Sequence, residues 1–188
     1  VRKIEGAART ITAAPDVVGA EMIKNSVATS RGSSVLVVGT LDTKGAELGF
    51  MRDILKGHGL AVKMVDLSTS GKPSGADIPP HAVATFHPRG SSGVFTGDRG
   101  SAVQGMTEAF ARWISVQEDI AGVISAGGSG GTALVSPAFR SLPVGIPKFL
   151  VSTVASGNIS QYVGASDITI MNSVADVQGL NSITKDIL

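Results

Sequence analysis

The chain contains no cysteine, which excludes disulfide bonds and thiolate metal sites and leads us to expect a cytoplasmic location. Aromatic residues make up only 4% of the sequence, so aliphatic side chains and methionine must build the core. No apolar run approaches the roughly 20 residues of a membrane-spanning helix, and the first residues lack the apolar centre of a secretory signal. Lysine and arginine form no block, so neither a membrane nor a nucleic acid is an expected partner.

Histidine is scarce as well. His58, His81 and His87 lie far apart, without carboxylates at the spacing of metal ligands. We therefore expect surface or loop histidines and no metal site. Ser129 has no evident histidine partner, so a serine hydrolase is not expected either.

Glycine, by contrast, is abundant, with 24 residues in 188. Glycine in regular structure lowers stability, so many of these residues must lie at tight turns or where the backbone approaches something closely. Apolar residues make up 43% of the chain and charged residues 16%, a composition typical of a globular domain.

Short apolar runs alternate with segments of helical periodicity, which predicts βαβ units and parallel strands. The result is an α/β fold: a doubly wound, mostly parallel, Rossmann-like open sheet of about five strands. The strands are expected over residues 35–39, 61–66, 121–126, 148–152 and 167–171, and the main helices over 45–57, 98–118 and 130–142.

The domain organisation predicted from the sequence has three parts. Residues 1–34 form an arm, either native or vector-derived, and residues 35–180 form a Rossmann-like nucleotide-binding domain. Residues 181–188 begin a truncated connection to a missing second domain. Residues 67–97 are rich in proline, glycine and serine and are expected to be mostly irregular, as a functional loop or lid. Trp113 lies on an apolar helical stripe and is expected in the core.

In an open parallel sheet, ligands bind beyond the carboxyl ends of the strands. The loop after the third strand is the most informative, because its four glycines lie between a buried strand and a helix. Consecutive amides there can point into one concavity at the positive end of the helix dipole, which suits a phosphate. Gly128, Gly130 and Ala133 fit the looser dinucleotide pattern G-x-G-x-x-A, but no acidic residue follows at the ribose-binding distance, and the loop is not a Walker A motif. The alternative is a tight, glycine-assisted turn.

The other loops add hydroxyl and charged groups. Asp42 or Thr43 can cap the next helix, while Lys44 at a helix start is unfavourable unless an anion lies beside it. Asp98 is most simply an N-cap, and Arg99 can reach an anion. The predicted nucleotide- or phosphate-binding residues are Thr40, Asp42, Thr43, Lys44, Ser68, Thr69, Ser70, Arg99, Gly127, Gly128, Ser129, Gly130, Gly131, Thr132, Thr153, Ala155, Ser156 and Gly157.

Several of these loops occur together in one known family. The motifs are Thr40-x-Asp42-Thr43-Lys44, Asp66-x-Ser68-Thr69-Ser70, Gly127–Thr132, Ala138–Lys148 and Val151–Gly157. In order and spacing, the chain resembles over residues 34–188 the family that comprises the tomato mosaic virus replication inhibitor and its bacterial and fungal relatives. Members of that family are larger and have two Rossmann-like domains, of which this chain resembles the first. The amino-terminal region of the plant protein binds ATP and grips the viral helicase.

The resemblance implies a nucleotide-binding domain that binds ATP, with or without Mg²⁺, forms a homo-oligomer and belongs to a two-domain protein. The viral partner does not carry over. Two alternatives remain open. One is an enzyme acting on a phosphorylated or acidic metabolite, with Asp42 or Asp98 as acid/base and Lys44 as electrophile. The other is a domain whose glycine loops are structural and whose role is oligomerisation.

Overall fold

The computed structural model describes residues 33–174 and 179–188. The expected amino-terminal arm lies outside these residues, except that Ser34 already opens the first strand. The strands are β1 (Ser34–Gly39), β2 (Val62–Asp66), β3 (Ile120–Gly127), β4 (Lys148–Ser152) and β5 (Thr169–Asn172). The helices are α2 (Leu41–Gly57), α3 (Pro80–Ala84), η1 (Gly90–Gly93), α4 (Arg99–Ser115), α5 (Ser129–Ser141), η2 (Thr153–Ser156), α6 (Ser160–Val163) and α7 (Ser182–Ile187).

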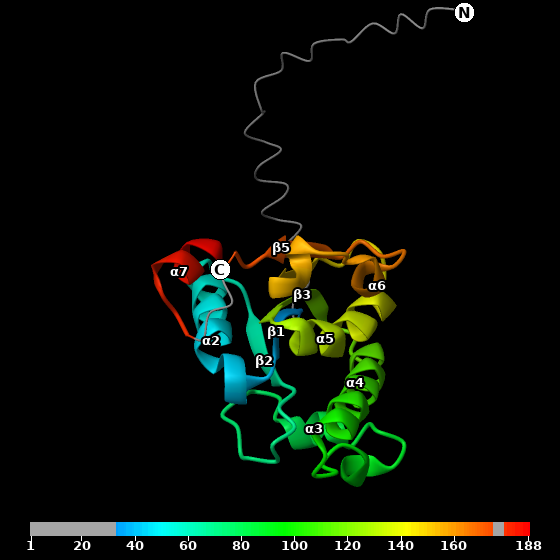
Figure 1. Cartoon of the computed structure of the whole chain (residues 1–188). Helices are drawn as coiled ribbons and strands as arrows, with labels where there is room; N and C mark the ends of the chain where they lie inside the picture. Colours follow the sequence, from blue (N-terminus) through cyan, green and yellow to red (C-terminus); the bar gives the residue numbers. More distant parts are fainter. Residues whose placement is uncertain (1–32, 175–178) are drawn as a thin grey trace, which may run out of the picture. The chain divides into compact units, whose positions relative to one another are not determined.

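The five strands form one sheet in the order β2-β1-β3-β4-β5, and every neighbouring pair is parallel (Figure 1). This confirms the predicted α/β, Rossmann-like fold. The strand positions were also predicted to within two residues at either end. The reason is that strands covered on both faces are continuous apolar runs, which the sequence displays directly.

Helices cover both faces of the sheet. Alternate residues of a strand point to opposite faces. In β1, Leu36 and Val38 belong to the larger core cluster, which is completed by α4 and α5, whereas Val37 belongs to the smaller cluster beneath α2. Figure 1 shows α2 on one side of the sheet and α4 and α5 on the other. Trp113 is 6% exposed and lies in the larger cluster, as predicted.

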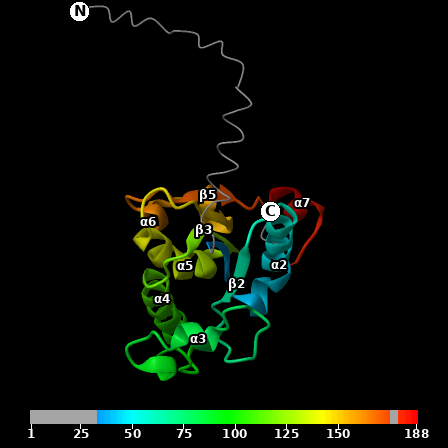
Figure 2. The same cartoon turned by 180° about the vertical axis from the view of Figure 1, so that it is seen from behind.

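The segment between β2 and α4 is mostly irregular, as its composition predicted. It also contains two short helices, α3 and η1, and Ile78 forms a parallel bridge with Val65 along the free edge of β2. Both views of the domain show α3 beside the end of α4 (Figures 1 and 2). The sequence analysis did not predict α3, because its proline was read as a loop residue, although proline also begins helices, where its missing N–H leaves no bond unmade.

His87 lies in the loop between α3 and η1, as one of the expected loop histidines, but it is buried. His87 is only 7% exposed, and its Nε2 lies 3.5 Å from Glu108 on α4. Its Nδ1 accepts a hydrogen bond from the Arg89 amide at 3.1 Å. His87 therefore belongs to the packing of the α3–η1 segment against α4 and is not a surface residue.

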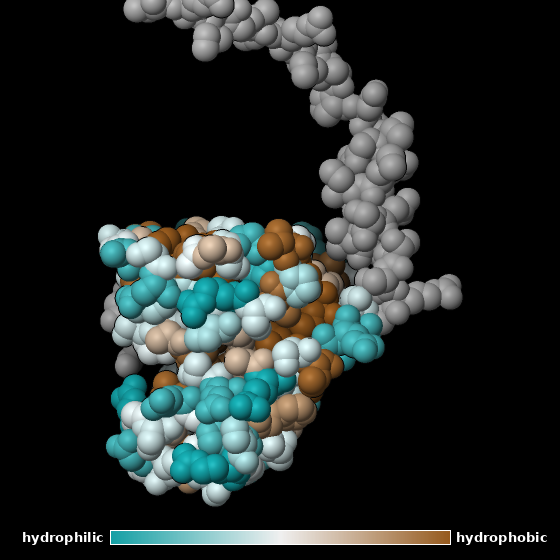
Figure 3. Space-filling view, turned by 90° about the vertical axis from the view of Figure 1, so that its right-hand side faces the viewer, coloured by the Kyte–Doolittle hydropathy of each residue, from teal (hydrophilic) through white to brown (hydrophobic). Residues whose placement is uncertain are grey.

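The side of the domain that carries α4, α5 and α6 is a mixture of polar and apolar side chains, with the apolar ones gathered along one margin (Figure 3). Among the large apolar residues that stay exposed are Val116 and Val144, which follow α4 and α5. Within the described residues, no helix has the length and apolar character to cross a bilayer.

A buried lysine supports the sheet at the end remote from the strand carboxyl termini. The side chain of Lys148, the first residue of β4, is 0% exposed. Its Nζ donates to the carbonyls of Pro143 and Ile146 and, at 2.6 Å, to Oδ1 of Asp167. The bond from Lys148, helped by the Gly145 amide, lowers the pKa of Asp167 to about 2. This ion pair fixes the turn before β4 to the start of β5.

The Asp167 carboxylate makes stability depend on acid. Since its folded pKa lies below the usual value of 3.8, its contribution is present above about pH 4 and is lost as the pH falls toward 2. We expect the urea midpoint to fall across this range. Asp167→Asn should be less stable at pH 7 and lose less of its remaining stability between pH 4 and pH 2. Equal pH slopes for the two proteins would contradict this assignment.

Close backbone contact between α4 and η1 gives a second test. A Cβ added at Gly105 would lie 2.2 Å from the Gly93 carbonyl oxygen, whereas one added at Gly49 on α2 would meet nothing within 4 Å. We expect Gly105→Ala to lower the free energy of unfolding by about 1–3 kcal/mol through overpacking. Gly49→Ala should raise it by up to about 1 kcal/mol through helix propensity. Urea denaturation measures both, and a stabilising Gly105→Ala would refute the contact.

Candidate functional site

The candidate site lies at the edge of the sheet where the strand order reverses. α2 leaves β1 over one face of the sheet, while α5 leaves the neighbouring strand β3 over the other, so the two connections part at the carboxyl edge. An open cleft of about 660 Å³ lies at this edge. Its lining comprises Thr40, Asp42, Thr43, Lys44, Thr69, Ser70, Gly97, Asp98, Arg99, Ala102, Val103, Gly127, Gly128, Ser129, Gly130, Gly131 and Leu134.

The first turn of α5 presents unbonded backbone amides to this cleft. Gly128 is the N-cap and has no side chain with which to cap the helix. Within residues 33–174 and 179–188, no protein group accepts a hydrogen bond from the amides of Ser129, Gly130 and Gly131. A helix start carries partial positive charge on just these amides, and water or an anion must satisfy them.

The glycines of this turn have different tasks. A Cβ at Gly127 would lie 3.3 Å from the Cα of Gly131, so a side chain at position 127 would crowd the turn itself. A Cβ at Gly130 or Gly131 would meet nothing within 4 Å. Glycine at these two positions therefore leaves open space above the amides, although the packing of the protein does not require glycine there.

Thr132 holds the turn in place from below. It is fully buried, and its Oγ1 donates to the Gly128 carbonyl at 2.9 Å and lies 2.6 Å from the Ser152 hydroxyl. The pair of hydroxyls joins the start of α5 to the end of β4. Thr132 was predicted as a binding residue, but it does not line the cleft and acts as a support.

The turn also has the spacing Gly-x-Ser-x-Gly of a hydrolase nucleophile elbow, from Gly127 to Gly131. Such an elbow holds its serine in a strained turn. Among the described non-glycine residues, positive φ occurs only at Val174, so Ser129 is not held in this way. No histidine lines the cleft. The serine is the first residue of an ordinary helix, which begins one residue before the start that the sequence predicted.

The start of α2 is satisfied from within the protein. The Leu41 amide donates to Oδ1 of Asp66 at 3.0 Å, and the Asp42 amide donates to Oγ of Ser68 at 3.1 Å. Asp66 also accepts the Ser68 amide at 2.8 Å and is 2% exposed. An internal carboxylate thus occupies the place that an anion would take. Ser68, predicted to bind ligand, is 3% exposed and does not line the cleft.

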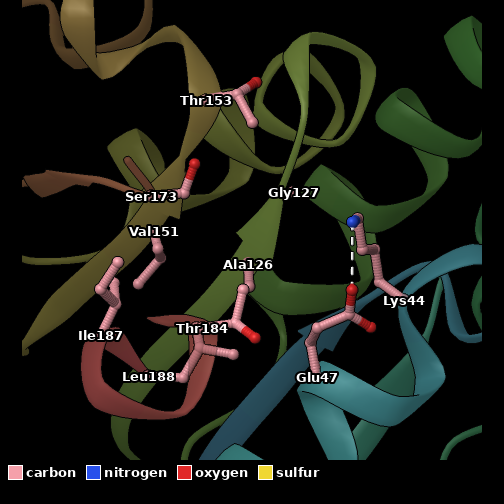
Figure 4. A pocket seen from close by; sticks show the side chains of 10 residues that line it. All are labelled: Lys44, Glu47, Ala126, Gly127, Val151, Thr153, Ser173, Thr184, Ile187 and Leu188. Carbon is pink, nitrogen blue, oxygen red and sulfur yellow. Dashed lines mark hydrogen bonds and ion pairs between the residues drawn. The ribbon is translucent and has the colours of Figure 1, made fainter. Parts of the chain in front are cut away.

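Lys44 interrupts α2 with a non-helical backbone, at φ −128° and ψ 20°. The sequence called for an anion beside it, and the chain supplies one: Nζ donates to Oε1 of Glu47 at 3.1 Å. Both residues also line a second, much smaller cavity of about 30 Å³, between α2, α7 and the ends of β3 and β4 (Figure 4). Thr153, a predicted binding residue, lines this cavity and not the cleft.

Two more charged groups come from the start of α4. Asp98 is its N-cap, as predicted, and accepts the Ser101 amide at 2.9 Å. This bond, with that from the Ser101 hydroxyl, holds the pKa of Asp98 below its usual value, so the carboxylate is charged at neutral pH. The side chain of Arg99 is exposed and makes no hydrogen bond or ion pair with any residue of the described ranges. Its guanidinium is thus available to a ligand in the cleft.

The structure brings most of the predicted residues to one place. Of the predicted set, the cleft gathers Thr40, Asp42, Thr43, Lys44, Thr69, Ser70, Arg99 and Gly127 through Gly131. Those that do not line it are Ser68, Thr132, Thr153, Ala155, Ser156 and Gly157. The sequence analysis missed Gly97 and the apolar wall of Ala102, Val103 and Leu134, since apolar helix residues look like core residues. It also left Asp66 out of the site, although an acidic residue ending an apolar strand is a signal of such a cap.

The arrangement suits a negatively charged ligand. Lys44, Arg99 and the α5 amides provide positive charge, hydroxyl groups of Thr40, Thr43, Thr69 and Ser70 line the same cleft, and its volume falls in the usual range for ligand sites. No group of three metal-ligating side chains occurs within residues 33–174 and 179–188. Mg²⁺ often binds through one or two carboxylates together with ligand phosphates, and Asp42 and Asp98 suit that role.

These features define an open, doubly wound α/β domain of the Rossmann-like class, with a polar cleft at its topological switch point. Residues 33–188 match the model of the family described as "Uncharacterised protein family (UPF0261) N-terminal domain", and the chain belongs to this family.

The relatives agree with the resemblance inferred from the loops. The chain is 44% identical over 155 residues to UPF0261 protein RA0729 of Rhizobium meliloti, covering 82% of this chain and 39% of the relative. It is 46% identical over 155 residues to UPF0261 protein mlr3387 of Mesorhizobium japonicum, with the same coverage. It is 39% identical over 183 residues to the ToMV resistance protein Tm-1(GCR237) of Solanum lycopersicum, covering 87% of this chain and 24% of the tomato protein. The chain therefore spans less than half the length of these relatives and corresponds to their N-terminal domain.

Asp66 gives a test of the capping arrangement. Asp66→Ala removes the acceptor for two backbone amides and leaves them unsatisfied near the buried end of β2. We expect the free energy of unfolding to fall by about 1–3 kcal/mol. Asp119→Ala, at an exposed aspartate, is the matched control and should change it by less than about 0.5 kcal/mol. Equal effects of the two substitutions in urea denaturation would show that Asp66 is not a structural cap.

Proposed function

We propose that this domain binds a phosphate-bearing ligand, a nucleotide such as ATP, in the cleft between α2, α4 and α5. The bound nucleotide supports regulation or partner recognition in a two-domain protein. The proposal includes a cytoplasmic location and assembly with a second copy of the chain, for which the absence of cysteine and the family resemblance are the support.

The observation that carries the proposal is the set of three unbonded amides at the start of α5. A 13-residue helix has a developed dipole, and its first-turn amides are a standard phosphate-binding element. The contrast with α2 strengthens the case, because there the equivalent amides already have Asp66 and Ser68 as acceptors. With open space above Gly130 and Gly131, a phosphate can approach the backbone closely.

The rest of the cleft suits the remainder of a nucleotide. We place the phosphates over Gly130 and Gly131 with Arg99 beside them, and the base against the apolar wall that Ala102 and Leu134 help to form. The hydroxyl groups after β1 and β2 are then available to the ribose. Where Mg²⁺ accompanies the ligand, Asp42 and Asp98 would hold it with the phosphate oxygens.

Comparison with relatives supports the two-domain part of the proposal. The tomato relative is named for resistance to a virus, a property of that protein, and the bacterial relatives carry only the family name. Because the chain corresponds to an N-terminal domain, the activity of the longer proteins is a separate matter from binding by this domain.

The second candidate is a contribution to an enzyme that acts on a phosphorylated or acidic metabolite. Two carboxylates, Asp42 and Asp98, line the same cleft as Lys44, an arrangement that could serve acid/base and electrophilic roles. The lowered pKa of Asp98 suits a base better than an acid at neutral pH. In this reading a second domain completes the active site.

Calorimetric titration tests the leading proposal. ATP, ADP, AMP, adenosine and inorganic phosphate are titrated with and without Mg²⁺, and we expect affinity to follow the number of phosphate groups. Gly130→Val fills the space above the amides, and Arg99→Gln removes a charged donor; each should weaken ATP binding by about tenfold or more.

The controls are Gly57→Ala at the far end of α2, where an added Cβ meets nothing within 4 Å, and Arg89→Gln at an exposed arginine outside the cleft. Both should bind ATP as the parent does. Adenosine binding as tightly as ATP, or full affinity in Gly130→Val, would sink the proposal. Phosphate release from ATP or a phosphosugar by the chain alone would instead favour the enzyme.

A further inference from the structure

One oxygen atom links the cleft to the carboxy-terminal segment, residues 179–188. Oε1 of Glu47 accepts a hydrogen bond from Nζ of Lys44 at 3.1 Å and another from the backbone amide of Gly179 at 3.2 Å. Glu47 is 4% exposed, so its buried oxygen atoms need such donors within the protein. Figure 4 shows the Lys44 and Glu47 side chains pointing toward each other beside the small cavity, with Thr184, Ile187 and Leu188 of the segment on its other side.

Lys44 stands between the two cavities. It lines the large cleft together with Thr40 and Arg99, and it lines the small cavity together with Glu47. The break in α2 at Lys44 puts this side chain at the boundary. An ammonium group has three donors and a flexible stem, so it can turn from Glu47 toward an anion in the cleft.

The segment 179–188 is a small folded unit held onto the domain. Asn181 and Thr184 form a capping box that starts α7, with bonds of 2.7 and 2.9 Å. Ile187 and Leu188 pack against the core cluster beneath α2. The hydrogen bond from the Gly179 amide to Oε1 of Glu47 ties the start of the segment to α2. Lys44 donates to the same oxygen atom.

We propose that a phosphate-bearing ligand in the cleft tightens the docking of residues 179–188 by drawing the Lys44 ammonium away from Glu47. The inference rests on the proposed function and adds its regulation. The family model is that of an N-terminal domain, and residues 179–188 are the last residues that it matches in this chain. The segment would thus report the state of the cleft at the surface of the domain beside α2.

The direction of the coupling follows from electrostatics. While Lys44 contacts Oε1, its positive charge offsets part of the negative charge of the Glu47 carboxylate, to which the Gly179 amide donates. When the ammonium moves toward a phosphate, the carboxylate charge is less compensated, and its bond to the remaining donor becomes stronger. Linkage then requires the reciprocal effect, so that a well-docked segment raises the affinity of the cleft for anions.

Hydrogen exchange of the 188-residue chain tests the inference, with ATP or inorganic phosphate at saturating concentration. We expect amide exchange within residues 179–188 to slow by about fivefold when ligand binds. In Lys44→Met, the ligand should bind more weakly and, at saturation, leave the exchange rate of this segment unchanged. Lys56→Met, at an exposed lysine of the same helix that lines neither cavity, should behave as the parent chain.

The reciprocal measurement loosens the segment and reads the cleft. Asn181→Ala breaks the capping box without touching Lys44, and it should weaken phosphate binding by about fivefold in the parent chain and not at all in Lys44→Met. Ligand binding with unchanged or faster exchange in residues 179–188 overturns the inference while the proposed function stands. Absence of ATP and phosphate binding overturns both.

Discussion

Backbone amides without acceptors at the start of α5 are the constraint around which the site is arranged. They exist because β1 and β3 are parallel neighbours whose connecting helices leave over opposite faces, which opens the carboxyl edge of the sheet. Thr132 and Ser152 hold the turn from the protein side, so the amides cannot fold back to find partners there. The cleft, its charge and its hydroxyl groups all surround these few N–H groups.

The two helix starts at this edge differ in how their first-turn amides are satisfied. At α2 a buried carboxylate, Asp66, satisfies the amides, and the helix is thereby fixed to β2. At α5 no side chain does so, and the helix start remains open to a ligand. The same physical demand is met once by the chain and once by its surroundings. A carboxylate at α2 also makes that end electrostatically unfavourable for a second anion, which supports the proposal of a phosphate site at α5 rather than at α2.

The sheet could be predicted from the sequence because buried parallel strands such as 148–152 are unbroken apolar runs. The glycine turn was predictable for a similar reason, since its position between strand and helix is local. The mostly irregular segment between β2 and α4 was predicted from its proline and glycine content, but the short helix α3 within it was missed, because proline occurs at helix starts as well as in loops. Asp66 capping Leu41 was missed because 25 residues separate them, and only the pairing of β1 with β2 brings them together. Ala155 to Gly157 do not line the cleft, since η2 follows β4, one strand further along.

The unequal demands on the glycines of the α5 turn have a consequence for sequence variation within the family. A side chain at Gly127 would crowd the Cα of Gly131 at 3.3 Å, so a substitution there requires a small shift of the turn. Gly130 and Gly131 are under no such packing constraint, because side chains there would project into open space. In a descendant protein released from selection for its ligand, glycine should therefore be replaced first at positions 130 and 131. Glycine at position 127 should be replaced more slowly, because the backbone contact there does not depend on a ligand.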